Sequence, residues 1–194
     1  MRPPDRKLVL ALVTFAVLVA ALALALLLRT EERRPHLEVG AHAPELVGQA
    51  VRDGEVSLER LRGHVVLVSF LNSRAEATPG GEPSRAQVVF LRSMQRQHAR
   101  FGLRVIVVDA AELAGAERPS RNDLVNYTYD WHLDPAIAVL PDDGASAHRF
   151  AVERAPTTFL IGPDGVVRKR WNGFAPAARL DLTIRRLEGR SPTG

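Results

Sequence analysis

Two short apolar runs on either side of a helical pattern are the feature that most constrains the fold of this chain. Residues 65–70 read VVLVSF, and residues 103–108 read LRVIVV. Runs of this kind, bounded by turn residues, are typical of strands that are buried on both faces. Between them, Val88, Leu91 and Gln95 recur with helical spacing. A strand, a helix and a strand in this order predict two parallel strands joined by a right-handed crossover.

Further elements extend this unit on both sides. A hairpin is predicted at residues 46–56, with its turn at Asp53 and Gly54, because this dipeptide favours tight turns. A second hairpin is predicted where the sequence GPDG at residues 162–165 separates two β-rich stretches. The remaining predicted elements are a strand at 136–140, a helical turn at 145–150, strands at 157–161 and 166–171, and a final helix at 176–187. This order predicts an α/β domain with a mixed central sheet flanked by helices.

Three serines stand where helices are predicted to begin. Ser120, with Asp123 three residues later, matches a capping box and predicts a short helix. Ser84 is predicted to cap the long helix between the two apolar runs. Ser57 is predicted to cap a helical turn that continues through residue 61.

The amino-terminal part contains a long stretch without charge. Residues 8–28 are apolar apart from Thr14, and a helix of this length spans roughly 30 Å, the thickness of a bilayer core. A cleavable signal peptide is the alternative, although its apolar region usually has about 7–15 residues. Basic residues are equally numerous on both sides of the stretch, so charge does not predict its orientation. We predict a basic segment at 1–7, a transmembrane anchor at 8–28, a linker at 29–36, a folded domain at 37–189 and a polar tail at 190–194.

The absence of cysteine excludes several classes of chemistry. Without a thiol, the chain forms no disulfide, offers no thiolate to a metal and has no thiol nucleophile. The net charge of +4 comes from 26 basic residues dispersed among 22 acidic ones, which does not favour a nucleic-acid partner. The six histidines show no metal-ligand spacing, and no glycine-rich phosphate motif is present. We therefore expect no metal, no cofactor and no nucleic acid as partners.

Four short motifs follow one another along the domain. They are GAHAP at residues 40–44, SLERLRGHVVLVSF at 57–70, APTTFLI at 155–161, and GPDG at 162–165 with the stretch up to residue 173. In this order they resemble the motifs of membrane-anchored, thioredoxin-like proteins of the TlpA/ResA and redoxin type. The resemblance covers about residues 40–187 and implies a thioredoxin-like fold. Because relatives of this type face outward, it also implies that the domain lies outside the cytoplasm.

The resemblance further implies a pair of cysteines at the start of the helix after the first core strand. Counted back from the helix, Gly81 and Ser84 occupy the two cysteine positions. Counted forward from the strand, the motif falls within residues 71–78, and neither alignment contains a thiol. Pro156 matches the family's cis-proline, which lies beside the redox motif and presents backbone groups to bound peptide.

These correspondences predict a groove for a partner. We expect a membrane-tethered, redox-inactive module that binds a protein or peptide. The alternative is an accessory component of a thiol-disulfide oxidoreductase system that has no redox thiols of its own. The walls of the predicted groove are Gly81, Glu82, Pro83, Ser84, Ala155, Pro156, Thr157 and Trp131.

Three further features allow more than one interpretation. The segment 126–132 contains both tyrosines and Trp131; such aromatics occur at recognition surfaces, but we favour packing in the core or at its edge. Asp109 follows the second buried strand, at the edge where α/β sheets hold ligands, yet a solvated carboxylate is the simpler expectation. Glu76 and Glu82 could act as an acid or a base only with a partner that the sequence does not identify.

Overall fold

The computed structural model describes residues 15, 19, 37–52, 54–78 and 81–189. Apart from Phe15 and Val19, the predicted anchor at 8–28 lies outside these residues, as do the predicted basic segment, linker and tail. Within the described residues, no helix is both long enough and apolar enough to cross a membrane. The folded domain is the compact unit that begins at Leu37.

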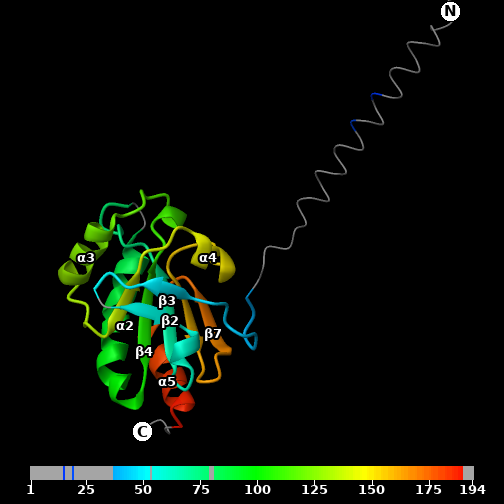
Figure 1. Ribbon diagram of the computed structural model, residues 1–194, viewed down its shortest axis with the longest axis vertical. Helices are drawn as coiled ribbons and strands as arrows, with labels where there is room; N and C mark the ends of the chain where they lie inside the picture. Colours follow the sequence, from blue (N-terminus) through cyan, green and yellow to red (C-terminus); the bar gives the residue numbers. More distant parts are fainter. Residues whose placement is uncertain (1–14, 16–18, 20–36, 53, 79–80, 190–194) are drawn as a thin grey trace, which may run out of the picture. The chain divides into compact units, whose positions relative to one another are not determined.

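A five-stranded mixed sheet forms the centre of the domain (Figure 1). Its strands are β3 (Val66–Leu71), β4 (Arg104–Asp109), β5 (Ile137–Leu140), β6 (Thr157–Ile161) and β7 (Val167–Asn172). They lie in the order β5-β4-β3-β6-β7, with β3, β4 and β5 parallel and β6 antiparallel to both of its neighbours. The predicted parallel pair and the predicted hairpin around residues 162–165 are therefore confirmed.

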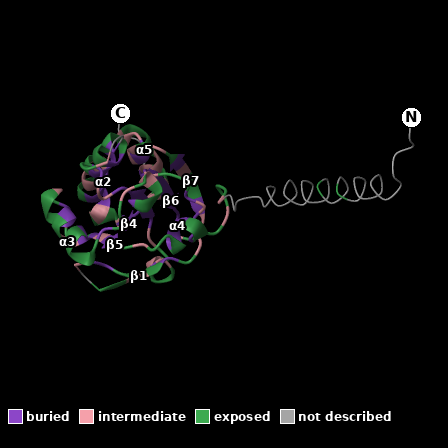
Figure 2. Cartoon of the chain, turned by 90° about the horizontal axis from the view of Figure 1, so that it is seen from above, coloured by how far each residue is buried: buried purple, intermediate pink, exposed green. Residues whose placement is uncertain are grey.

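Side chains alternate between the two faces of β3 and so contribute to two cores. Leu67 and Leu71 belong to one core, which is covered by α2 (Glu82–His98), α3 (Arg121–Asp130) and α5 (Ala177–Leu187). Phe70 belongs to the other core, as does Ala147 of α4 (Ala145–Arg149). Full burial of a side chain such as Phe70 contributes about 1.5–3 kcal/mol to folding. Figure 2 shows the buried residues in the interior and the exposed ones on the outer faces of the helices.

A small hairpin lies beside the main sheet. It consists of β1 (Val47–Gln49) and β2 (Glu55–Ser57), which pair in antiparallel register as predicted. The backbone N–H of Val51 donates to the carbonyl oxygen of Val139 at 2.9 Å, which ties the hairpin to the edge strand β5. Part of this exposed sheet edge is therefore covered by the chain itself.

The three predicted serine caps have different outcomes. Ser120 and Asp123 form the capping box: Ser120 Oγ accepts from the Asp123 N–H at 3.2 Å, and Asp123 Oδ2 accepts from the Ser120 N–H at 2.8 Å. The prediction that Ser84 caps α2 is wrong, because α2 begins two residues earlier and Ser84 lies inside its first turn. The prediction for Ser57 is wrong as well, because Ser57 is the last residue of β2 and the 3₁₀ turn at Glu59–Leu61 has no side-chain cap.

Candidate functional site

The carboxyl end of β3 and the start of β6 meet at one edge of the sheet. Phe70 and Thr157 are register partners, so Pro156 lies beside the loop that leaves β3. The peptide bond before Pro156 is cis. The carbonyl oxygen of Pro156 accepts a hydrogen bond of 2.7 Å from the backbone N–H of Gly173, which follows β7. This edge therefore brings together the loops after β3 and β7 and the segment before β6.

Gly81 stands at the amino-terminal cap position of α2, where its main chain is covered by the preceding loop. A Cβ atom added to Gly81 would lie 2.1 Å from the carbonyl oxygen of Ala75 and 2.7 Å from its Cα atom. Real Cβ atoms do not approach backbone this closely, so a side chain at position 81 requires the loop to move. The first of the two predicted cysteine positions is thus closed by the main chain.

Ser84, the second predicted cysteine position, is buried. Its hydroxyl oxygen accepts a hydrogen bond of 3.2 Å from the backbone N–H of Asn72, which is also buried. Glu82 and Pro83, which lie between the two positions, are exposed. The helix start therefore presents the side chains of Glu82 and Pro83 to solvent, whereas Ser84 holds the loop after β3.

Asp109, the last residue of β4, accepts hydrogen bonds from the same loop. Its Oδ1 atom accepts from the Ser73 hydroxyl at 2.6 Å and from the backbone N–H groups of Ser73 and Ala111 at 3.4 and 3.3 Å. Burial raises the pKa of the carboxyl, and these hydrogen bonds offset only part of that effect. The expectation of a solvated carboxylate was wrong, because the loop after β3 folds over Asp109 and excludes water from it.

A cavity of about 280 Å³ lies between the loop after β3 and α3. Tyr127 and Trp131 line it, with ring centroids 6.4 Å apart. Tyr127 is only 6% exposed, which confirms core packing for this residue, whereas Tyr129 is 63% exposed. Burial, with a smaller contribution from Asp109, raises the pKa of Tyr127, so its phenol stays protonated. The polar side chains in the wall are those of Ser73, Arg74, Glu76, Asp123, Asn126 and Asp130.

An aromatic pair lies on the surface near Pro156. Phe90 of α2 and Phe174 of the loop after β7 have ring centroids 5.1 Å apart. Gln87 of α2 fixes this loop, because its Oε1 atom accepts from the backbone N–H of Ala175 at 2.7 Å. The sequence offered no signal for the pair, since the two phenylalanines are distant in the chain and only the fold brings them together.

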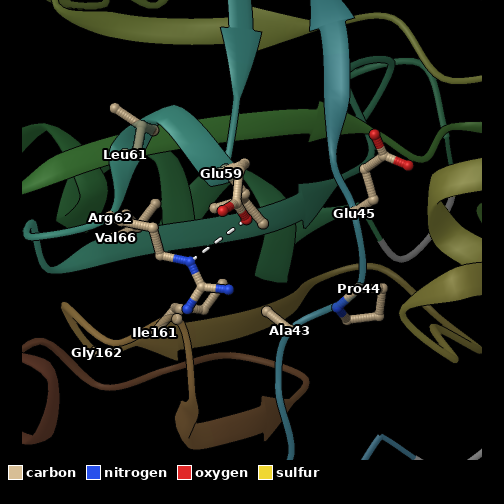
Figure 3. A pocket seen from close by; sticks show the side chains of 11 residues that line it. Ala43, Pro44, Glu45, Glu59, Leu61, Arg62, Val66, Ile161 and Gly162 are labelled. Carbon is tan, nitrogen blue, oxygen red and sulfur yellow. Dashed lines mark ion pairs between the residues drawn. The ribbon is translucent and has the colours of Figure 1, made fainter.

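A second cavity, of about 240 Å³, lies at the opposite end of the sheet, where Val66 pairs with Ile161. Figure 3 shows the side chain of Arg62 beside Ile161, with an ion pair of 3.6 Å between its Nε and Glu59 Oε2. Arg62 also donates to the carbonyl oxygen of Asp164. The wall is mainly apolar and distant from Pro156, so this cavity is separate from the candidate groove.

Within residues 37–52, 54–78 and 81–189, no three histidine, aspartate or glutamate side chains converge as metal ligands. The buried His98 of α2 instead contacts two carboxylates of the carboxyl-terminal segment. Its Nε2 atom lies 2.8 Å from Asp181 Oδ1, and its Nδ1 atom lies 3.1 Å from Glu188 Oε2. This arrangement joins helices and leaves neither ring nitrogen open to a ligand.

No protein-family model matches this chain, and no curated protein matches it in sequence. Several solved structures do match. A protein described as the thiol:disulfide interchange protein DsbE of Chlorobium tepidum has 25% sequence identity and a TM-score of 0.65, over 79% of this chain and 99% of that chain. A thioredoxin-family thiol:disulfide interchange protein from Chlorobium tepidum TLS has 18% identity and a TM-score of 0.64, over 78% of this chain and 99% of that one.

The thioredoxin domain of a thiol-disulfide oxidoreductase from Bacteroides vulgatus is also similar. Its identity is 18% and its TM-score 0.62, over 77% of this chain and 97% of that chain. The domain therefore has a thioredoxin-like α/β fold, as the four sequence motifs predicted. Its sequence nevertheless contains no cysteine.

Proposed function

We propose that this protein is a membrane-tethered, redox-inactive thioredoxin-like module that binds a protein or peptide partner outside the cytoplasm. The observation that carries the proposal is the closed start of α2, where Ala75 leaves no room for a side chain on Gly81. Thiol-disulfide exchange requires an attacking thiolate, and the chain has no cysteine to supply one. The domain thus has the thioredoxin-like fold, but the main chain of Ala75 occupies the space that a side chain at position 81 would need.

The exposed aromatic surface beside Pro156 supports the binding part of the proposal. Phe174 is 39% exposed and packs on Phe90, while Val89 on the same helix is exposed as well. Apolar side chains gathered on a surface are typical of protein contact sites, and large aromatic residues contribute most to such contacts. The N–H of Gly173 donates to the carbonyl oxygen of Pro156, so Phe174 directly follows a residue that is hydrogen-bonded to the predicted groove.

The membrane part of the proposal rests on the sequence. Residues 8–28 are long and apolar enough to span a bilayer as a helix. The outward orientation rests on the resemblance to TlpA/ResA-type proteins. Deleting residues 8–28 should move the protein from the membrane fraction to the soluble fraction, and a periplasmic reporter fused after residue 189 should be active. A reporter that is active only in the cytoplasm would reverse the orientation.

Redox inactivity can be measured with the full-length protein in detergent. Insulin reduction by dithiothreitol should proceed at the same rate with and without the protein, because no thiol is available to relay electrons. An active thioredoxin serves as the positive control. Turnover above the dithiothreitol background would contradict the proposal.

Partner binding can be tested by placing a photo-crosslinking phenylalanine analogue at position 174 of the full-length protein in cells. The matched control is position 101, also a phenylalanine and 40% exposed, compared with 39% for Phe174. Phe101 follows the carboxyl end of α2, away from Pro156. We expect a discrete cross-linked protein band from position 174 and none from position 101. Equal labelling at the two positions would reject this surface as the binding site.

A further inference from the structure

The cavity between the loop after β3 and α3 has an excess of negative charge. Its charged wall residues are Arg74, Glu76, Asp123 and Asp130. Arg74 Nη2 pairs with Asp123 Oδ2 at 2.9 Å, which neutralises one carboxylate. Glu76 and Asp130 are exposed at the rim, and neither has an ion-pair partner within the described part of the chain. Two carboxylates of the cavity are therefore not balanced by a neighbouring cation.

Tyr127 contributes a buried aromatic ring to the wall of the cavity. This residue lines the cavity and is 6% exposed, yet its hydroxyl has no hydrogen-bond partner among the described residues. A buried hydroxyl without a partner destabilises the folded state, and most such groups in proteins are satisfied by a protein atom, a water or a ligand.

The aromatic part of the wall favours the same kind of ligand. Trp131 is half-buried at the end of α3 and packs against Tyr127, so two aromatic rings lie beside the two unbalanced carboxylates. Cations bind favourably over the faces of such rings, with tryptophan the best of the aromatic residues. An anionic ligand would instead be repelled by Glu76 and Asp130.

We propose that this cavity binds the cationic side chain of an arginine or lysine of the partner. The volume of about 280 Å³ lies just below the range of roughly 300–1,000 Å³ for pockets that hold a whole small molecule, so it suits a single long side chain. The proposal rests on the proposed function, because it names the chemistry of the segment that the module recognises. Carboxylates at the rim bind the charged head, and the rings of Tyr127 and Trp131 contact the head and the stem below it.

The test uses the full-length protein in detergent micelles at low salt, with Nα-acetyl-arginine-N-methylamide as the probe and its citrulline analogue as the neutral control. The readout is the NMR signal of the Trp131 indole N–H, assigned with a Trp131→Phe variant. We expect a saturable shift with the arginine probe and with the corresponding lysine probe, and no saturable shift with citrulline.

Single substitutions then test which carboxylates of the cavity bind the arginine probe. Asp130→Asn and Glu76→Gln should each weaken binding of the arginine probe roughly tenfold, since the amide that replaces the carboxylate lacks its negative charge and binds the guanidinium less strongly. Glu45→Gln is the matched control, because Glu45 is an exposed carboxylate on the wall of the other cavity. It should bind the probe as tightly as the unaltered protein. Circular dichroism must show that each variant is folded.

Equal binding of the arginine and citrulline probes would overturn the proposal. So would unchanged affinity in a folded Asp130→Asn, Glu76→Gln double variant. Because the probes act without the partner, they separate the two proposals. Lost probe binding with an intact cross-link at position 174 rejects only the cationic site, whereas intact probe binding without that cross-link rejects the aromatic surface as the partner site.

Discussion

The imidazole of His98 and the carboxylate of Asp181 join α2 to α5 through a contact of 2.8 Å between Nε2 and Oδ1. His98 is fully buried, and its Nδ1 atom faces Glu188 at 3.1 Å. The side chain of His98 thus contacts carboxylates at both ring nitrogens. Two of the helices on one face of the sheet are therefore held by these polar contacts in addition to their apolar packing.

Replacing His98 with leucine should lower the free energy of unfolding by about 1–3 kcal/mol, because the carboxylate oxygens of Asp181 and Glu188 lose their contacts with the ring nitrogens. The measurement is urea unfolding followed by tryptophan fluorescence. Asp181→Asn is the control: Asp181 is partly exposed, and asparagine keeps an acceptor for His98, so the loss should stay near 1 kcal/mol. A leucine variant as stable as the unaltered protein would show that these contacts add nothing to folding.

Gly81→Ala should destabilise the domain by about 1–3 kcal/mol, because the new Cβ atom overlaps the carbonyl oxygen of Ala75. Faster hydrogen exchange at the amide of Ala77 should accompany the loss, since this N–H is bonded within the displaced loop. Gly48→Ala is the matched control. A Cβ atom there meets Leu140 at an ordinary 3.5 Å, so this variant should unfold like the original chain.

Asp109→Asn should change how stability depends on pH. Because burial raises the pKa of Asp109 in the folded state, the folded protein holds this proton more tightly than the unfolded chain does. The contribution of Asp109 to the free energy of unfolding is therefore complete below the pKa that this aspartate has in the unfolded chain. It is lost as the pH rises through the higher pKa that it has in the folded protein. Asparagine still accepts hydrogen bonds from Ser73 and Ala111. Because its amide does not titrate, its contribution to stability does not change with pH.

Urea unfolding at several pH values checks this prediction. The stability difference, variant minus unaltered protein, should increase across that window by about 1.4 kcal/mol for each tenfold difference between the two dissociation constants. Acids with a lowered pKa, such as Asp181, act in the opposite direction and are common to both proteins. A difference that is constant with pH would contradict the assignment.

Tyr127→Phe should leave the unliganded protein equally stable or up to about 1 kcal/mol more stable. The substitution removes a buried hydroxyl that has no hydrogen-bond partner in the described part of the chain and keeps the ring contact with Trp131. Thermal unfolding measures the effect, with the exposed Tyr129→Phe as a control that should change nothing. A clear destabilisation would mean that the hydroxyl has a partner, such as a bound water.

Local patterns were sufficient to predict the central elements. The two apolar runs predicted β3 and β4, because strands buried on both faces leave little room for polar residues. The capping box at Ser120 was also predicted, since both of its bonds are made between residues three apart. Ser57 and Ser84 have the right residue type for a cap, but the backbone at their positions is strand and helix interior, which composition alone does not reveal.

The candidate site depended on contacts that no local pattern contains. Asp109 was expected in solvent, and its burial follows from the path of the loop that carries Ser73 and Ala75. The contact between Ala75 and Gly81 arises from how that loop returns to α2. Whether the predicted groove around Pro156 binds a partner stays a prediction until position 174 has been cross-linked.

The closed start of α2 bears on how such a protein evolves. A cysteine acquired at position 81 through a single codon change would meet the main chain of Ala75 before it met any substrate. A cysteine at position 84 would replace a buried hydroxyl that now holds Asn72. Point mutations at these two positions alone therefore do not create an exposed thiol pair, and such a pair would require the loop that carries Ala75 to move. The course of the backbone, as well as the residue types at positions 81 and 84, thus keeps thiol chemistry away from the start of this helix.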